Sequence, residues 1–260
     1  MHAGASQPTR PFLRRPEVQG ALLDGALALV LALLRAYHAT WPTDLDQFYY
    51  AGKAMLQGRS PYGAVGPDRE FQWDWPLNYP LPAVILTLPL TLLSVPGARI
   101  CFSVIGGCVL GYALGKDHFR RIGLVLSAAF LITVLRNQWS PYYTAAYFAP
   151  LAAIFLAAKP NMAVAMVAGI RTRKQFLWVA GLGLMLGVAS LIAVPSWPLQ
   201  WLGALREMEH VVPPIMRSFG FLYLLALLKW RRPEARVFLA LVCVPQTPSL
   251  YDLLPLFIVT

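Results

Sequence analysis

Two acidic residues with the spacing needed for chemistry lie between Pro42 and Lys53, directly after the first long apolar run. Thr43 can cap the N-terminus of a helix, and Asp46 stands where the acid of a capping box reaches back to the cap. Asp44 lies one residue after the cap, where the helix dipole stabilises a negative charge. An ionised carboxylate beside a cavity at a membrane surface can accept a proton from an incoming hydroxyl group. The stretch therefore offers two candidate general bases, for which capping and dipole stabilisation are the structural alternatives.

The residues after these acids have the pattern of an amphipathic helix. Apolar or small residues recur at helical spacing, and Gly58 follows as a stop signal. These residues are Leu45, Phe48, Tyr49, Gly52, Met55 and Leu56. We predict a helix from about Asp44 to Gln57 that lies along the membrane surface and does not cross the membrane.

The composition is that of a multi-pass membrane protein. Of the 260 residues, 57% are hydrophobic and only 13% are charged, whereas a soluble domain has roughly a quarter of its residues charged. The net charge of +10 comes from short Lys and Arg clusters between apolar runs, and no soluble basic domain for nucleic acid is present. Such clusters are typical of cytoplasmic turns. We therefore expect a multi-pass protein of the cell (inner or plasma) membrane with a cytoplasmic N-terminus and no nucleic-acid partner.

The succession of apolar runs predicts an all-α fold, a polytopic transmembrane helical bundle of about 7–9 membrane segments in a single domain, residues 1–260. The first membrane helix is expected at about residues 19–37, after a cytoplasmic tail at 1–18. Acidic residues outnumber basic ones in 38–77, which we assign to the first external loop, and a second external loop is expected at 195–212. Further apolar runs lie at about 99–114, 122–135, 143–158, 162–170, 175–194, 214–228 and 235–244.

A basic cluster, Lys116 with Arg120 and Arg121, constrains the topology of the segment before it. If this cluster is cytoplasmic, residues 78–114 cross the membrane only once, so the proline-rich run 78–95 must be re-entrant. The alternative is that the positive-inside rule fails at this turn. With the re-entrant choice, five polar residues fall on the external side, namely Asp44, Asn137, Gln138, His210 and Asp252. No helix pair shows a spacing of small residues on which a packing prediction could rest.

Metal and nucleotide chemistry have little support in the sequence. Cys101, Cys108 and Cys243 lie in apolar segments without metal-ligand spacing, and the four histidines are scattered. Asp44 and Asp46 form a DxD pattern, but the nucleotide-sugar domain that usually carries this pattern is missing. No P-loop and no HExxH motif is present. We therefore predict no metal site and no bound nucleotide.

Charged residues within or near the apolar runs are the remaining candidates. Arg136 and Lys159 can pair with a lipid phosphate, with lipid anchoring as the alternative for both. Arg35, near the end of the first membrane helix, is expected to snorkel to the interface. For Asp24 in the same helix, simple interfacial exposure competes with a functional role.

Several short motifs follow one another along most of the chain, and their order is informative. They are Asp44–Ala51, Gly58–Tyr62, Tyr79–Pro82, Asn137–Ser140, Lys159–Pro160 and Tyr251–Asp252. This series resembles the polytopic polyprenyl-phosphate-mannose-dependent α-mannosyltransferases of the GT-C class, which include the mycobacterial phosphatidylinositol-mannoside enzymes. Two positions depart from the family pattern: Asn137 stands where the family has Gly, and the second proline of a Tyr-Pro-Pro element is displaced to Pro82. The chain is also shorter than members usually are and ends in an apolar run, so we expect a short or truncated product.

The resemblance implies an inverting glycosyltransferase of the cell envelope that moves a sugar, mannose in this family, from a polyprenyl-phosphate carrier to a lipid-linked or glycan acceptor. It assigns the general base to Asp44, leaves Asp46 as a possible second acid, and makes Arg136, Lys159 and Arg217 candidates to stabilise the leaving phosphate. The other donor- or acceptor-binding residues that it implies are Tyr49, Tyr50, Asn78, Tyr79, Asn137, Gln138, His210, Tyr251 and Asp252. The lipid-linked sugar is a co-substrate, so no cofactor and no metal is implied, and the partners are membrane lipids, the sugar donor and the acceptor.

A lipid or small-solute transporter without catalytic activity is the competing hypothesis. Broken helices and polar residues within the membrane suit a transporter as well. Against it, no pair of inverted halves is visible, and the polar residues crowd one face. An enzyme needs Asp44 in a cavity that lipid and water both reach, whereas a transporter needs polar groups along a path through the middle of the helical bundle.

Overall fold

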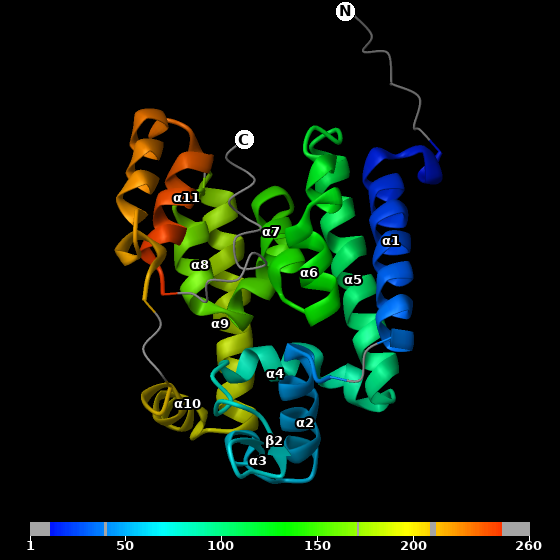
Figure 1. The fold of residues 1–260 in the computed structure, drawn as a ribbon, viewed down its shortest axis with the longest axis vertical. Coiled ribbons are helices and arrows are strands. Elements are labelled where there is room, and N and C mark those ends of the chain that lie inside the picture. Colours follow the sequence, from blue (N-terminus) through cyan, green and yellow to red (C-terminus); the bar gives the residue numbers. More distant parts are fainter. Residues whose placement is uncertain (1–10, 39–40, 171, 209–211, 246–260) are drawn as a thin grey trace, which may run out of the picture.

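The computed structural model describes residues 11–38, 41–170, 172–208 and 212–245, and these ranges are predominantly helical (Figure 1). The only strand pairing in them is parallel and joins β1 (Val65–Gly66) to β2 (Phe71–Gln72). The all-α prediction is therefore confirmed.

Three helices are long and apolar enough to cross a membrane, α1 (Pro16–His38), α5 (Val95–Lys116) and α9 (Arg173–Ala193). Their 21 to 23 residues, at about 1.5 Å each, reach the ~30 Å thickness of a hydrocarbon core. The structure supports three such helices and not about seven to nine, because the other apolar runs in the described residues fold as shorter pieces.

Prolines divide several of these runs. The helix expected at 143–158 is two elements, α7 (Ser140–Phe148) and η4 (Pro150–Ala158), because a proline disfavours helical geometry in the residue before it. The run 78–95 folds as α4 (Leu81–Thr87) and η2 (Leu88–Leu92), which are too short to cross a membrane. The remaining elements are η1 (Phe12–Arg14), η3 (Ile122–Leu126), α6 (Ala128–Arg136), α8 (Pro160–Val167), η5 (Pro214–Met216), η6 (Gly220–Lys229) and α11 (Pro233–Cys243).

Helices α1 and α5 pack antiparallel along a seam of glycines. On α5, Gly107, Gly111 and Gly115 recur at every fourth residue and face α1. A Cβ built on Gly111 would lie 2.1 Å from the carbonyl oxygen of Gly20, so the two backbones touch there. Such spacing of small residues lets membrane helices approach closely. Our expectation that no useful small-residue spacing exists was therefore wrong.

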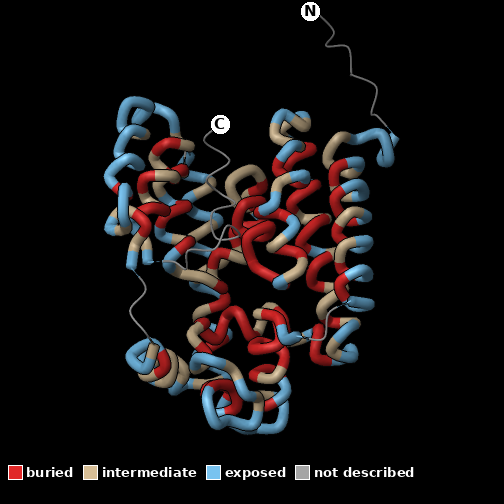
Figure 2. The backbone as a smooth tube through the Cα atoms, viewed as in Figure 1, coloured by how far each residue is buried: buried red, intermediate tan, exposed pale blue. Residues whose placement is uncertain are grey.

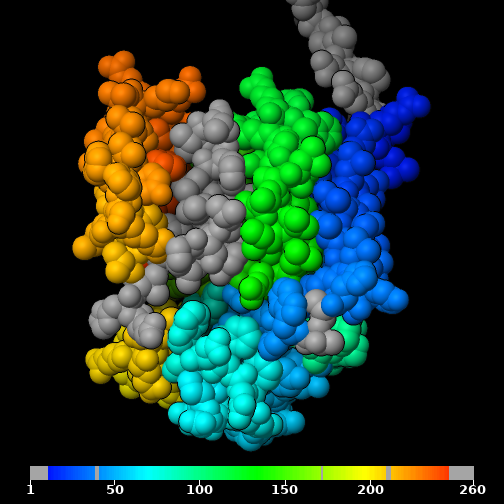
Figure 3. Space-filling model, viewed as in Figure 1, coloured from blue at the N-terminus to red at the C-terminus, as the bar shows by residue number. Residues whose placement is uncertain are grey.

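One end of the molecule is covered by α2 (Asp44–Leu56), α3 (Pro61–Ala64), α4 and α10 (Trp197–Arg206), at the bottom in Figures 1 and 3. The helix predicted at about residues 44–57 is confirmed as α2, and its 13 residues span only ~20 Å, too short for a crossing. Most of α2 is buried within the protein, as the red tube in Figure 2 shows. It is therefore more enclosed than a helix that merely lies on a surface.

Basic residues outnumber acidic ones at one end of the molecule, whereas the other end carries charges of both signs. The N-terminal ends of α1 and α9, the C-terminal end of α5 and the turn between η6 and α11 lie opposite α2, at the top in Figure 1. The basic residues at or next to these ends are Lys116, Arg120, Arg121, Arg173, Lys174, Lys229, Arg231 and Arg232. The α2 end contains acids and bases together, namely Asp44, Asp46, Asp68, Glu70 and Asp74 with Arg35, Lys53, Arg59, Arg69 and Arg99. The basic end therefore agrees with the charge pattern from which the cytoplasmic side was predicted, whereas the α2 end is mixed in charge.

Candidate functional site

Asp44 is the first residue of α2 and is half-buried. The side-chain amide of Gln138 donates a hydrogen bond from Nε2 to Asp44 Oδ2, across 94 residues of sequence. An amide N–H that donates to a carboxylate oxygen fixes the orientation of the carboxylate. The structure thus brings together Asp44 and Gln138, which lie in two separate sequence motifs.

The turn between α6 and α7 places Gln138. Asn137 ends α6 in the left-handed region, with φ 52° and ψ 55°, a conformation that suits glycine or asparagine. This explains in backbone terms how asparagine occupies a position where the motif series expects glycine. The Asn137 side chain donates from Nδ2 to the carbonyl oxygen of Arg99 and to Ser103 Oγ, both at 2.8 Å.

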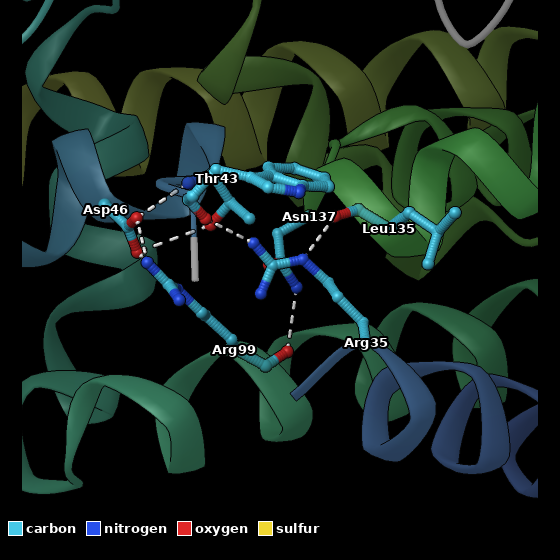
Figure 4. Close-up of polar contacts among 7 residues, drawn as sticks. Arg35, Thr43, Asp46, Arg99, Leu135 and Asn137 are labelled. Carbon is cyan, nitrogen blue, oxygen red and sulfur yellow. Dashed lines mark hydrogen bonds and ion pairs between the residues drawn. The ribbon is translucent and has the colours of Figure 1, made fainter. Parts of the chain in front are cut away.

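Asp46 is held by a different set of partners (Figure 4). Arg99 donates to both of its carboxylate oxygens, from Nε to Oδ1 at 2.9 Å and from Nη2 to Oδ2 at 2.5 Å. The backbone nitrogen of Thr43 donates to Oδ2 at 2.7 Å, which is the capping-box contact that the sequence predicted. The side chain is 1% exposed, so Asp46 acts as a cap and as the partner of a buried arginine.

The two acids are therefore chemically unequal although only one residue separates them. The side-chain amide of Gln138 is one partner of Asp44, which remains partly exposed, whereas a guanidinium and the cap enclose Asp46. Because the Asp46 carboxylate is already paired with Arg99, a metal ion shared by the two acids has little support. Among the described residues, no group of three or more His, Cys, Asp or Glu side chains could hold a metal ion.

Arg35 and Arg99 also lie in the region around Asp44 and Asp46, where the sequence motifs did not predict them. Arg35 does not snorkel as expected: it is 5% exposed and donates from Nε to the carbonyl oxygen of Leu135 and from Nη2 to that of Trp41, both at 2.7 Å. Its guanidinium also lies 4.5 Å from the centre of the Trp41 ring, and that of Arg136 lies 4.8 Å from the same ring. A charge inside an apolar run is a signal of function, and it could have selected both arginines.

Asp24 differs from its expected interfacial exposure. It is 2% exposed and faces the glycine seam, where a Cβ on Gly111 would lie 2.8 Å from the Asp24 Cβ. Its Oδ2 has no hydrogen-bond partner among the residues that the structure describes. Asp24 belongs to the helix seam and not to the Asp44 region.

An aromatic cluster lines the buried side of α2. Phe48 packs edge-on against Tyr79 and Trp139, with ring centres 4.6 and 5.7 Å apart. Lys159 Nζ lies 6.0 Å from the Tyr79 ring centre, so these two predicted residues lie close together. Burial raises the pKa of Tyr62, whose hydroxyl donates to the Tyr79 carbonyl oxygen at 3.1 Å. This contact fixes the chain next to the cluster.

Other predicted binding residues have structural contacts. Tyr49 donates from its hydroxyl to the carbonyl oxygen of Leu93 at 2.8 Å, and Tyr50 stacks on Phe71 with ring centres 4.2 Å apart. The backbone carbonyl oxygen of Asn78 accepts from Trp201 Nε1 at 2.9 Å, while its side-chain oxygen is buried without a partner among the described residues. These contacts explain why the segments stay near α2.

Arg217 is not brought to Asp44. It follows η5, and η5 and η6 pack against α11, on the other side of the bundle from α2 in Figure 1. His210, Tyr251 and Asp252 lie outside the described residues. The region that the structure assembles thus contains Asp44, Asp46, Asn137 and Gln138. Arg136 lies next to it across Trp41, and Tyr79 and Lys159 lie next to it across Phe48.

No protein-family model, curated protein or solved structure matches this chain.

Proposed function

We propose that the protein is an integral-membrane glycosyltransferase that moves a sugar, mannose by resemblance, from a polyprenyl-phosphate carrier to a lipid-linked or glycan acceptor with inversion. The observation that carries the proposal is the inequality of the two acids. Asp44 is oriented by a neutral amide and stays partly exposed, while Asp46 is enclosed by Arg99 and the helix cap. The partly exposed carboxylate is the one that we propose for proton transfer, and the enclosed one keeps the site in shape.

In the proposed reaction, Asp44 accepts the proton of the acceptor hydroxyl, whose oxygen attacks the anomeric carbon from the face opposite the phosphate. The bond from that carbon to the phosphate oxygen breaks, and the carrier phosphate leaves with the electron pair. Gln138 keeps Asp44 oriented toward the acceptor. Arg136 and Lys159, at opposite sides of the α2 region, are the cations proposed to approach the leaving phosphate.

The proposal places α1, α5 and α9 across the cell membrane, with the α2 end outside and the N-terminus in the cytoplasm. The basic residues at the opposite end support this orientation, because Lys and Arg are enriched at cytoplasmic helix ends. The shorter apolar elements, such as α4 with η2 and η6, would then enter the membrane partway, in place of some of the spans that the sequence predicts.

A transporter would require buried polar groups along the length of the bundle. Buried neutral polar side chains such as Thr133, Thr144 and Ser190 do lie within the bundle. The buried charged residues in the described ranges are Asp24, Arg35 and Asp46, and only Asp24 lies away from the α2 end. This distribution supports a site at one end of the molecule, and therefore favours the enzyme proposal over a path through the middle.

The test is sugar transfer by the full chain in nanodiscs, with labelled polyprenyl-phosphate-mannose as donor and a membrane lipid extract as acceptor source. We expect Asp44→Asn to lower the transfer rate by a factor of ~100 to 10,000, because an amide cannot accept the proton. Asp68→Asn is the matched control: Asp68 is exposed near the same end, and its φ of 55° suits asparagine as well.

Near-normal transfer by Asp44→Asn would show that Asp44 is not the base. The unaltered chain could instead transfer no sugar and move the labelled lipid-linked donor into sealed vesicles. That result would reject the enzyme proposal in favour of the transporter hypothesis.

A further inference from the structure

A pocket of about 240 Å³ lies between the C-terminal end of α1 and the N-terminal end of α5. Its lining consists of Ala32, Arg35, Ala36, Pro96, Arg99, Ile100, Ser103 and Asn137. Pockets that hold an entire drug-sized ligand usually measure about 300–1,000 Å³. This pocket is therefore sized for a head group and not for a complete lipid.

Two arginines give the pocket its charge. Arg35 uses Nε and Nη2 for the carbonyl oxygens of Leu135 and Trp41, and Arg99 uses the same two nitrogens for Asp46. Within the described ranges, no hydrogen bond from the remaining Nη1 of either arginine is made. Each guanidinium thus retains donors for a further acceptor.

Positive charge exceeds negative charge at this place. Arg35 interacts electrostatically with two cations, Arg99 and Arg136, and with one anion, Asp46. Figure 4 shows Arg35 and Arg99 approaching from the two helices, with Asp46 beyond Arg99. Buried or partly buried charges of one sign are costly unless they are compensated, so this arrangement suits an anionic ligand.

Asn137 adds an independent sign that a ligand is expected. Its side chain is 2% exposed, and its amide oxygen has no hydrogen-bond partner within the described ranges, although its amide nitrogen has two. Buried polar oxygens are nearly always hydrogen-bonded. A phosphate monoester offers several acceptor oxygens for the arginines, and Asn137 adds an uncompensated polar group to the pocket lining.

The rim of the pocket is apolar and lies at the end of two candidate membrane helices. Ala36 and Pro96 are exposed at the rim, and Ile100 and Ala32 complete its apolar surface. Arg35 stands three residues before the end of α1, at the level where lipid phosphates border the hydrocarbon core. An anionic group attached to an apolar chain matches both halves of this lining.

We propose that this pocket binds the phosphate monoester head group of a membrane lipid, with Arg35 and Arg99 as its cationic contacts. The inference shares the membrane location with the proposed function but does not require sugar transfer. Its test therefore measures binding and not turnover.

The experiment uses the full chain in phosphatidylcholine nanodiscs and measures the binding of phosphatidic acid and, separately, of inorganic phosphate. Ala36→Trp should fill the mouth of the pocket without removing a charge, and we expect it to weaken phosphatidic acid binding at least tenfold. Leu33→Trp is the matched control, because Leu33 lies on the same helix, is exposed and does not line the pocket. Arg35→Gln should weaken binding as well, but it also removes two contacts to backbone carbonyl oxygens.

Binding of phosphatidic acid that is equally strong in Ala36→Trp and in the unaltered chain would overturn the proposal. Equal affinity for inorganic phosphate and phosphatidic acid would overturn its lipid part. Tighter binding of phosphatidic acid that Ala36→Trp abolishes and Leu33→Trp preserves would support it, whatever the outcome of the transfer assay.

Discussion

The helix pair α1–α5 is joined in two different ways along its length. Toward the N-terminal end of α1, backbone meets backbone, and a Cβ on Gly111 would lie 2.1 Å from the Gly20 carbonyl oxygen. Toward the α2 end, the same two helices present Arg35 and Arg99, and a pocket of about 240 Å³ separates them. The contact at the glycine seam depends on the absence of side chains, whereas the arrangement at the pocket depends on the long charged side chains of Arg35 and Arg99.

This difference shows where a ligand can bind. Close helix contact leaves no space between α1 and α5 at the glycine seam, whereas the arginines hold the helices apart and connect them to α2 and α6. The stability of the seam should therefore respond to side-chain size, and that of the α2 end to charge. The following predictions separate these two dependences.

The largest loss of stability is expected for Arg99→Gln. This change leaves the Asp46 carboxylate, which is 1% exposed, without its cationic partner. Removal of one member of a buried ion pair typically costs about 3–5 kcal/mol. The measurement is the free energy of unfolding in mixed micelles titrated with a denaturing detergent.

The double variant Arg99→Gln with Asp46→Asn is the control for this prediction. Since no unpaired charge remains buried, we expect it to recover most of the lost stability. A double variant as unstable as the single one would mean that packing of the Arg99 side chain, and not its charge, holds the α2 end.

A smaller loss is expected for Gly111→Ala in the seam. The new methyl group would collide with the α1 backbone, so the helices must separate, and overpacking of this kind typically costs about 1–3 kcal/mol. Gly183→Ala on α9 is the matched control, because nothing lies within 4 Å of a Cβ there and alanine is the better helix former. Equal effects of the two substitutions would contradict a size-dependent seam.

The long elements of the fold could be predicted because each depends on its own residues. The apolar runs that form α1, α5 and α9 are continuous, and the charge clusters between them are local. The seam could not be read in the same way, because the glycines of α5 recur at every fourth residue but the α1 residues that oppose them are of different types, namely Pro16 with Glu17, Gly20, and Asp24 with Ala28. Helix pairing depends on both surfaces, and only one of them carried a recognisable spacing.

The candidate site was partly predictable for the same reason. The cap contact of Asp46 with Thr43 joins residues three positions apart, so the sequence shows it directly. The pairs Asp46–Arg99 and Asp44–Gln138 are 53 and 94 residues apart, and they form only when α2, α5 and the α6–α7 turn meet. The topology with a re-entrant run at 78–95 predicted a common side for Asp44 and Gln138, but it carried no information on Arg35 or Arg99.

The smallest effect is expected for Arg59 and Glu70, an ion pair beyond the C-terminal end of α2 whose side chains are 48% and 63% exposed. A hydrogen bond from Arg59, followed by the attraction of its charge, lowers the pKa of Glu70. The pair therefore stabilises the folded state above the pKa of an unfolded glutamate, about 4.3, and this contribution disappears as pH falls through the lower pKa of the folded state. Water screens such a pair strongly, so the effect should be slight. We expect Glu70→Gln to lower Tm slightly at pH 7, by an amount that declines as the pH falls below about 4.3, and Glu17→Gln at the opposite end serves as the comparison. Glu70→Gln at pH 7 could instead lower Tm as much as Arg99→Gln. Charge at the α2 end would then affect stability whether or not it is buried, and burial of the Asp46–Arg99 pair would not explain how this end differs from the glycine seam.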